Sequence, residues 1–249
     1  MKNLEKELYF IFRDKYNEKW QKAMLTDILR LKAGEPVDYI IGWMPFLNTK
    51  IDLSFRPLIP RPETEYWTEK FIEHTKVIKW PPLRIADVFA GSGCIGIAIL
   101  KSLKHSKVDF FEIDPKLISQ IKKNLRINKI LASRYKVIQS DILKKAKGGY
   151  DFIVGNPPYL SPKNIKRIQK SVLNYEPKIA LFGGKDGLAI IERFVKEAKK
   201  YLKKDSGLWF EFDAPQKAKI ASLFLKEKYR NIKFSKDQYG KWRFASAGV

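Results

Sequence analysis

The chain has one cysteine, two histidines and three methionines among its 249 residues. A single cysteine cannot form an internal disulfide, and the sequence has no group of thiols that could hold zinc. No apolar run approaches the roughly 20 residues that a transmembrane helix requires. Lys2, Glu5, Lys6 and Glu7 make the N-terminus too charged for a signal peptide. We therefore expect the protein to make no membrane contact and to lie in the cytoplasm.

Acidic residues are also scarce: 27 Asp and Glu stand against 49 Lys and Arg, which gives a formal net charge of +22. Most of the excess falls in residues 101–204, with 25 basic and 9 acidic side chains. One interpretation is a basic surface that contacts RNA or the ribosome. The other is a solvated, Lys-rich surface without a partner, because the lysines are scattered rather than interleaved with aromatic residues. The sequence leaves both interpretations open.

Two short regions precede the main domain. Residues 1–35 are expected to form a short helical segment, because apolar side chains recur at helical spacing: Leu4, Leu8, Ile11 and Phe12, then Trp20, Met24, Ile28 and Leu31. Residues 36–82 are expected to form a β-hairpin, over 46–55, and a linker. A helix should follow the prolines at 60 and 62, and Trp80-Pro81-Pro82 marks the boundary of the region.

Residues 83–249 alternate between strand and helix patterns. Strands are expected at 84–89, 108–113, 135–139, 151–154 and 208–212, helices at 94–103, 115–128 and 188–202, and a closing strand pair near 232–234 and 242–244. Such alternation is typical of an α/β fold with a mostly parallel, doubly wound sheet. Ligands of these folds bind beyond the carboxyl ends of the strands.

A glycine turn follows the first strand of this domain, with the sequence Phe89-Ala90-Gly91-Ser92-Gly93. The two glycines allow the backbone to approach a ligand closely. The turn lacks the Gly-x-Gly-x-x-Gly of dinucleotide sites and the Gly-Lys-Ser/Thr of phosphate loops. A shorter turn of this kind suits a ligand without phosphates, such as S-adenosylmethionine, although the motif alone would favour an ordinary strand-to-helix turn.

Polar side chains follow the next two strands. Glu112 ends the second strand and could accept both hydrogens of a ribose diol. Asp141 follows the third strand and could accept from an adenine amino group, with Ile142 packed on the ring. Either acid alone could be a surface carboxylate. Because the carboxyl ends of parallel strands meet at one edge of a sheet, the turn and both acids together predict a cofactor site.

The fourth strand is followed by Asn156-Pro157-Pro158-Tyr159. The prolines have no N–H and stiffen the loop, which therefore displays one amide, backbone carbonyls and a phenol. These acceptors can bind both hydrogens of a planar NH₂ group while the aromatic ring covers its plane. The tetrapeptide by itself is also compatible with an ordinary turn.

With these motifs, the chain resembles the HemK/PrmC-type N5-glutamine methyltransferases, which modify the Gln of the Gly-Gly-Gln loop in class 1 peptide chain release factors. The resemblance is carried by two further blocks, 59–65 (Ile-Pro-Arg-Pro-Glu-Thr-Glu) and 175–188, which contains Gly-Gly-Lys-Asp-Gly-Leu. It implies a class I S-adenosylmethionine-dependent fold. The family usually has Gly where this chain has Phe89, and usually has a larger N-terminal bundle to grip the release factor.

The resemblance implies that residues 89–93, Glu112, Asp141, Ile142 and Asn156 hold S-adenosylmethionine and that the loop at 156–159 holds the substrate amide. We expect the Asn156 side-chain oxygen and the Pro157 carbonyl to accept from the substrate NH₂ and aim its nitrogen at the methyl group. Tyr159 would pack on the amide plane. The partner would be a class 1 release factor, docked in part by residues 1–35.

Two alternatives remain at the level of sequence. The same loop occurs in methyltransferases that act on adenine N6 or guanine N2 of RNA or DNA, whose exocyclic amines pose the same geometric problem, and the net charge favours them. A non-catalytic RNA-binding protein could also keep this fold.

Overall fold

The computed structural model describes residues 2–77 and 82–249, so Trp80 and Pro81 of the expected boundary lie outside the described residues. The N-terminal module comprises α1 (Lys2–Phe10), a π-helical turn (Ile11–Lys15), α2 (Met24–Lys32) and α3 (Val37–Ile41). A small core joins these elements: Ile11, Tyr16, Met24, Leu31 and Ile40. The helical segment is confirmed, but α3 extends it beyond residue 35. Trp20 is 64% exposed and lies outside this core.

A hairpin links this module to the main domain. Its strands are β1 (Trp43–Phe46) and β2 (Thr49–Asp52), so it begins three residues earlier than predicted. Thr49 and Ile51 point inward. The Asn124 and Asn128 side chains of the main domain bond to the backbone of β2, which fastens the hairpin to that domain.

The main domain contains a seven-stranded sheet with the order β5-β4-β3-β6-β7-β9-β8. The parallel strands are β3 (Arg84–Val88), β4 (Lys107–Glu112), β5 (Tyr135–Gln139), β6 (Tyr150–Gly155) and β7 (Leu202–Glu211). β9 (Trp242–Gly248) runs antiparallel to both β7 and β8 (Arg230–Lys236). The chain moves outward from β3 in one direction through β4 and β5, and in the other through β6 and β7. The expected doubly wound sheet is confirmed, with a crevice at β3 and β6 where the direction reverses.

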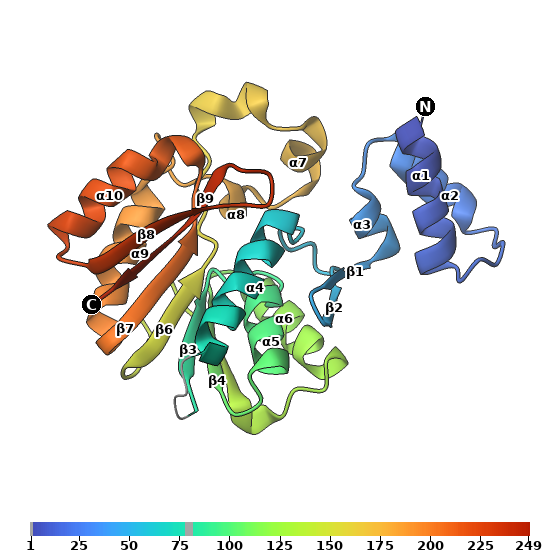
Figure 1. Cartoon of the computed structure of the whole chain (residues 1–249). Coiled ribbons are helices and arrows are strands. Elements are labelled where there is room, and N and C mark those ends of the chain that lie inside the picture. Colours follow the sequence, from blue (N-terminus) through green and yellow to red (C-terminus); the bar gives the residue numbers. More distant parts are fainter. Residues whose placement is uncertain (1, 78–81) are drawn as a thin grey trace.

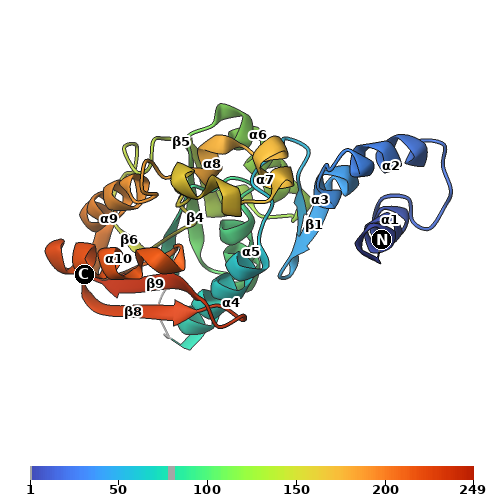
Figure 2. The ribbon, with the colours of Figure 1, turned by 90° about the horizontal axis from the view of Figure 1, so that it is seen from above.

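Helices cover both faces of the sheet (Figures 1 and 2). One face packs on α4 (Pro62–Val77), α5 (Cys94–Ser102) and α6 (Pro115–Ile127), with Trp67 and Phe71 of α4 fully buried. The other packs on α9 (Ala189–Tyr201) and α10 (Lys217–Lys226) through Phe194 and Phe224. Both figures show α1–α3 beside this three-layer domain, joined to it through β1 and β2.

Between β6 and α9, the chain forms a 3₁₀ turn (Pro162–Arg167), α7 (Lys170–Tyr175) and α8 (Lys178–Leu181), none of which the sequence predicted. Two further 3₁₀ turns, Ala132–Arg134 and Ala214–Gln216, precede β5 and α10. β7 begins at Leu202, six residues before the predicted start, and its pairing with β6 is irregular between Leu202 and Gly207. Within the described ranges, no helix is both long and apolar enough to cross a membrane.

Candidate functional site

The glycine turn lies at the carboxyl end of β3, as predicted. Its backbone is left-handed at Phe89 (φ +60°), Gly91 (φ +55°) and Gly93 (φ +81°). A side chain in this region costs about 1–2 kcal/mol, so the backbone is strained at Phe89, where a glycine would not be. The Phe89 ring packs edge-on against Phe194 of α9, with 5.1 Å between the ring centroids. This contact offsets part of the backbone strain at Phe89 and stabilises the left-handed conformation of the turn.

A pocket opens beside this turn, at the carboxyl ends of β3, β4, β5 and β6. The predicted residues that line it are Phe89, Ala90, Gly91, Ser92, Glu112, Asp141, Ile142, Asn156 and Pro158. Leu58, Arg61, Thr64 and Ile179 are among the other lining residues. Gly93, Pro157 and Tyr159 do not line it. Gly93 is the N-cap of α5, and a Cβ there would lie 3.2 Å from the Ile97 side chain and 3.3 Å from that of Ile121.

Glu112 is 7% exposed and braces the turn. Its Oε2 accepts from the Gly91 N–H at 2.8 Å, and its Oε1 accepts from Ile113 and Asp114 N–H at 2.8 and 2.9 Å. Burial raises the pKa of the carboxyl, and these three N–H groups oppose the shift. A carboxylate has about four lone-pair sites, and three of them are used here, so Glu112 keeps about one site for a hydroxyl of a ligand in the pocket.

Asp141 and Ile142 follow β5, and Ile142 is buried with a left-handed backbone (φ +51°). Asp141 Oδ2 accepts from Lys144 Nζ and from Arg193 Nη2, each at 2.7 Å, which lowers the pKa of the carboxyl. Asp141 Oδ1 makes neither of these bonds and remains an acceptor. The pair therefore offers a charged acceptor beside an apolar surface, which suits an adenine amino edge and its ring face.

Asp87 is a buried acid that the sequence analysis did not single out. Its Oδ2 accepts from the Gly96 N–H at 2.9 Å, whereas its Oδ1 has no hydrogen-bond partner among the described residues. Burial raises its pKa to about 8. Asp87 lies in β3, and its side chain reaches the first turn of α5 beside the glycine turn. Its position directly before the turn motif was the available signal.

The Asn156 amide is oriented by a chain of hydrogen bonds. Asn156 Nδ2 donates to Thr64 Oγ1 at 3.3 Å, and Thr64 Oγ1 donates to Glu211 Oε2 at 2.6 Å. Because the only hydroxyl proton of Thr64 is directed to the carboxylate, its oxygen acts as the acceptor for Asn156. The Asn156 side-chain oxygen is left for a ligand in the pocket.

Glu211, at the end of β7, is 1% exposed and receives three donors. They are Thr64 Oγ1, Trp67 Nε1 at 3.0 Å and the Tyr159 hydroxyl at 2.8 Å. Burial raises the pKa of the carboxyl, while the three donors favour its charged form. Sequence analysis singled out neither Thr64 nor Glu211 for a role. The structure places the Tyr159 ring between the loop and Glu211, and burial raises the pKa of its hydroxyl.

Two glycines lie directly against the backbone of the loop at 156–159. A Cβ on Gly183 would lie 2.3 Å from the Pro158 carbonyl oxygen, and one on Gly187 would lie 2.1 Å from that of Tyr159. The Gln216 side chain donates to the Tyr159 and Gly187 carbonyls at 2.9 and 3.1 Å. The Gly-Gly-Lys-Asp-Gly block is therefore glycine-rich because the loop backbone lies directly on it.

The remaining sequence block meets the site through Arg61. Its guanidinium donates to Glu176 at 2.5 Å, and Glu176 also accepts from the Ile59 N–H. This bond joins residues 59–65 to residues 175–188, so the two blocks that carry the family resemblance lie in contact at the pocket. Within the described part of the chain, no group of three His, Cys, Asp or Glu could hold a metal ion.

Comparison with known proteins agrees with this arrangement. Residues 68–178 match the family model described as methyltransferase small domain. The release factor glutamine methyltransferase of Lactococcus lactis is 31% identical over 95% of this chain and 86% of its own length. That of Clostridium botulinum is 32% identical over 99% and 88%. That of Thermodesulfovibrio yellowstonii is 34% identical over 85% and 75%.

Solved structures share the fold at low sequence identity. A methyltransferase from Pyrococcus furiosus is 18% identical with a TM-score of 0.61, over 90% of this chain and 98% of that one. The ribosomal protein L11 methylase of Lactobacillus delbrueckii is 18% identical with a TM-score of 0.58, over 80% and 83%. These likenesses support the class I methyltransferase fold. Since the curated relatives exceed 30% identity across most of both chains, this protein belongs to the release factor glutamine methyltransferases.

Proposed function

We propose that this protein transfers the methyl group of S-adenosylmethionine to the side-chain amide nitrogen of the glutamine in the Gly-Gly-Gln loop of a class 1 release factor. Family membership supports S-adenosylmethionine as the cofactor and release factor glutamine as the target. The observation that carries the proposal is the orientation of Asn156, whose NH₂ faces Thr64 and whose oxygen is left for the pocket.

The pocket fits the cofactor in its chemistry. Glu112 suits a ribose diol, Asp141 and Ile142 suit adenine, and the glycine turn removes Cβ atoms from the path of the ligand. Phe89, Ala90 and Ser92 supply lining beside the glycines. When bound there, S-adenosylmethionine supplies a sulfonium methyl as electrophile.

The loop would prepare the substrate nitrogen. An amide nitrogen is a weak nucleophile because its lone pair is delocalised into the carbonyl group. In our proposal the Asn156 side-chain oxygen and the Pro157 carbonyl accept the two amide hydrogens and favour the positive charge that develops on the nitrogen. Pro158 narrows the pocket beside them. In the same proposal Tyr159, whose hydroxyl donates to Glu211, would pack on the amide plane. We assign no general base.

The N-terminal module is the proposed docking surface for the release factor. It exposes large apolar side chains: Tyr9, Trp20, Leu25 and Leu29, between 51% and 66% exposed. Single exposed apolar residues are ordinary, but several on one small module are typical of a protein contact. We place the activity in the cytoplasm, where translation termination occurs, and infer that the basic surface contacts RNA.

The test is a methyl-transfer assay with labelled S-adenosylmethionine. Its substrates are a release factor with an intact Gly-Gly-Gln loop, the same factor with the glutamine changed to alanine, and total RNA. Label on the intact factor alone is the expected result. Label on RNA alone would contradict the proposal and indicate a methyltransferase of exocyclic base amines. Failure to bind S-adenosylmethionine would instead indicate a non-catalytic protein.

A further inference from the structure

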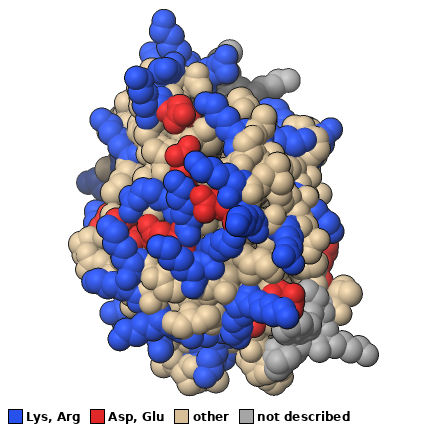
Figure 3. All heavy atoms as spheres, turned by 90° about the vertical axis from the view of Figure 1, so that its left-hand side faces the viewer, with Lys and Arg blue, Asp and Glu red and all other residues tan. Residues whose placement is uncertain are grey.

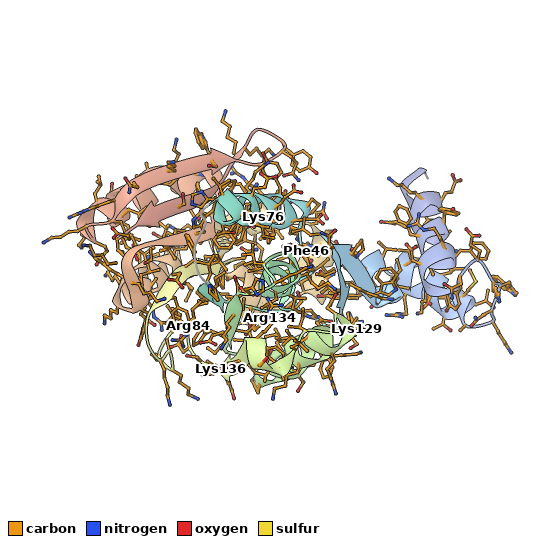
Figure 4. All side chains as sticks on the ribbon, turned by 60° about the horizontal axis from the view of Figure 1, so that its bottom comes forward. Phe46, Lys76, Arg84, Lys129, Arg134 and Lys136 are labelled. Carbon is orange, nitrogen blue, oxygen red and sulfur yellow. The ribbon has the colours of Figure 1, made fainter. Side chains whose placement is uncertain are left out.

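A second cavity lies at the opposite end of the sheet from the cofactor pocket, where β3, β4 and β5 begin. It measures about 410 Å³, and five of its eight lining residues are basic: Arg84, Lys107, Arg134, Lys136 and Lys147. Figure 4 looks onto this end of the molecule and shows Arg84, Arg134 and Lys136 around it. A water occupies about 30 Å³, so the cavity has room for a much larger polar group.

The positive charge of this cavity is poorly compensated. The only acidic lining residue is Asp109, whose Oδ2 already accepts from Arg84 Nη2 at 2.9 Å and from the Tyr150 hydroxyl at 2.8 Å. Of the five cations, Arg84 alone has a carboxylate partner within 4.0 Å among the described residues. The other four carry charge that a bound anion would neutralise.

Arg134 is a half-buried cation that has no carboxylate partner among the described residues. Its Nε and Nη2 donate to the backbone carbonyls of Leu103 and Ser106 at 2.6–3.1 Å, which fixes the guanidinium without neutralising it. Burial lowers the pKa of this group. Nη1 makes none of these bonds, so the guanidinium that lines the cavity is held in place and keeps free N–H donors. Arginine in this state is suited to phosphate oxygens.

The surroundings favour a polymer of phosphates over a single one. Lys129, just beyond α6, lies along the same end of the molecule in Figure 4, and residues 101–204 carry the basic excess. The half-buried Tyr135 lines the cavity beside Arg134 and Lys136, which places an aromatic ring among the cations. The face in Figure 3 also carries many cations, but acidic side chains lie among them.

We propose that this basic cavity binds the phosphodiester backbone of RNA. Four residues of β3, 85–88, separate Arg84 from the cofactor turn, so RNA bound here would leave the methyl-transfer site open. The inference goes beyond the proposed function and does not depend on it, because the cavity shares no residue with the methyl-transfer pocket. It also assigns the RNA contact to a defined place.

The test compares two triple variants of the full chain. Lys107→Gln/Lys136→Gln/Lys147→Gln removes exposed cavity lysines, and Lys19→Gln/Lys22→Gln/Lys32→Gln removes exposed lysines of the N-terminal module. Both lower the formal net charge from +22 to +19, since each removes three positive charges. Binding of a labelled single-stranded RNA of about 12 nucleotides is measured by anisotropy between about 50 and 200 mM salt.

Each lost phosphate contact lowers the log–log salt slope by about 0.7 for a single strand. We therefore expect the cavity variant to lose about 2 from the slope, which reduces its salt sensitivity over this range roughly 16-fold. The control variant should keep the parent slope. An unchanged thermal unfolding midpoint of the cavity variant verifies its fold.

Three results would overturn the proposal. Equal slopes for the two variants would mean that net charge alone attracts RNA. A mononucleotide that binds as tightly as the oligomer would indicate a small phosphate ligand. A polyglutamate peptide of equal length that binds more tightly than RNA would indicate an acidic protein partner.

Discussion

Replacing Thr64 with valine tests the orientation of the catalytic amide. Valine keeps the shape of threonine but removes the hydroxyl that accepts from Asn156 Nδ2 and donates to Glu211. A neutral hydrogen bond contributes about 0.5–1.5 kcal/mol. If this bond selects the productive orientation of the amide, its loss lowers kcat by up to about tenfold, because 1.4 kcal/mol corresponds to one decade. The KM for the release factor and the affinity for S-adenosylmethionine should change little.

Asn156→Ala removes the acceptor itself, and loss of one group that stabilises the transition state costs about 10²–10³ in kcat. If Thr64 acts through Asn156, Thr64→Val should have almost no further effect in the Asn156→Ala background. Thr64→Ser retains the hydroxyl and should recover most of the activity. The assay is steady-state methylation of the release factor by the parent and the four variants, with cofactor affinity measured separately.

Two outcomes would refute this reasoning. Unchanged kcat in Thr64→Val would mean that the amide keeps its orientation without the hydroxyl. Multiplicative losses in the double variant would mean that Thr64 acts independently of Asn156. Thermal unfolding of Thr64→Val tests whether a loss of activity comes from misfolding. We expect the variant to stay folded, because the buried Glu211 keeps two of its three donors.

Three further predictions concern stability and docking. Asp87 keeps its proton up to about pH 8 in the folded state and loses it near pH 4 when unfolded, so it destabilises the fold increasingly as pH rises between these values. The gain in Tm of Asp87→Asn over the parent should therefore grow from pH 5 to pH 8. A constant difference in Tm would contradict the raised pKa. Gly187→Ala places a Cβ 2.1 Å from the Tyr159 carbonyl oxygen, whereas the Cβ of Gly240→Ala, at nearly the same φ, meets nothing within 4 Å. Gly187→Ala should lower the free energy of unfolding by about 2 kcal/mol more than Gly240→Ala and abolish methylation. Equal denaturation midpoints of the two variants would argue against close packing of residues 183–187 on the loop. Trp20→Ala with Leu29→Ala should raise the KM for the whole release factor while turnover of a short Gly-Gly-Gln peptide is unchanged, and equal effects on both substrates would argue against docking.

The sequence predicted the catalytic fold well because the pattern of each strand is local. The strand at 135–139 was predicted with both ends correct, and the helix after the glycine turn ended within one residue of its prediction. In a buried parallel sheet, each strand shows as a short apolar run bounded by turns. The positions of the turn, Glu112, Asp141 and Asn156 at one edge of the sheet followed from that topology.

The sequence did not show how the amide is held. Thr64 and Glu211 lie 147 residues apart, and no local pattern reveals a contact of that separation. Helical spacing also failed at Trp20, because the chain leaves the helix after a π-helical turn and re-enters it at Met24, so the apolar stripe loses its phase. The early start of β7 rests on the pairing of Leu202 with Tyr150, and the polar residues 203–206 that follow show no apolar alternation from which a strand could be predicted.

The buried Glu211 has a consequence for the newly made chain. The glycine turn, Glu112 and Asp141 are all synthesised before β7, whereas Thr64 and Tyr159 acquire their shared carboxylate only when residue 211 has left the ribosome and β7 has joined the sheet. A nascent chain that stops before this point holds the cofactor-binding residues without an organised acceptor for the substrate amide. Methylation competence is thereby deferred until the second half of the sheet is complete, and premature termination yields a fragment that lacks it.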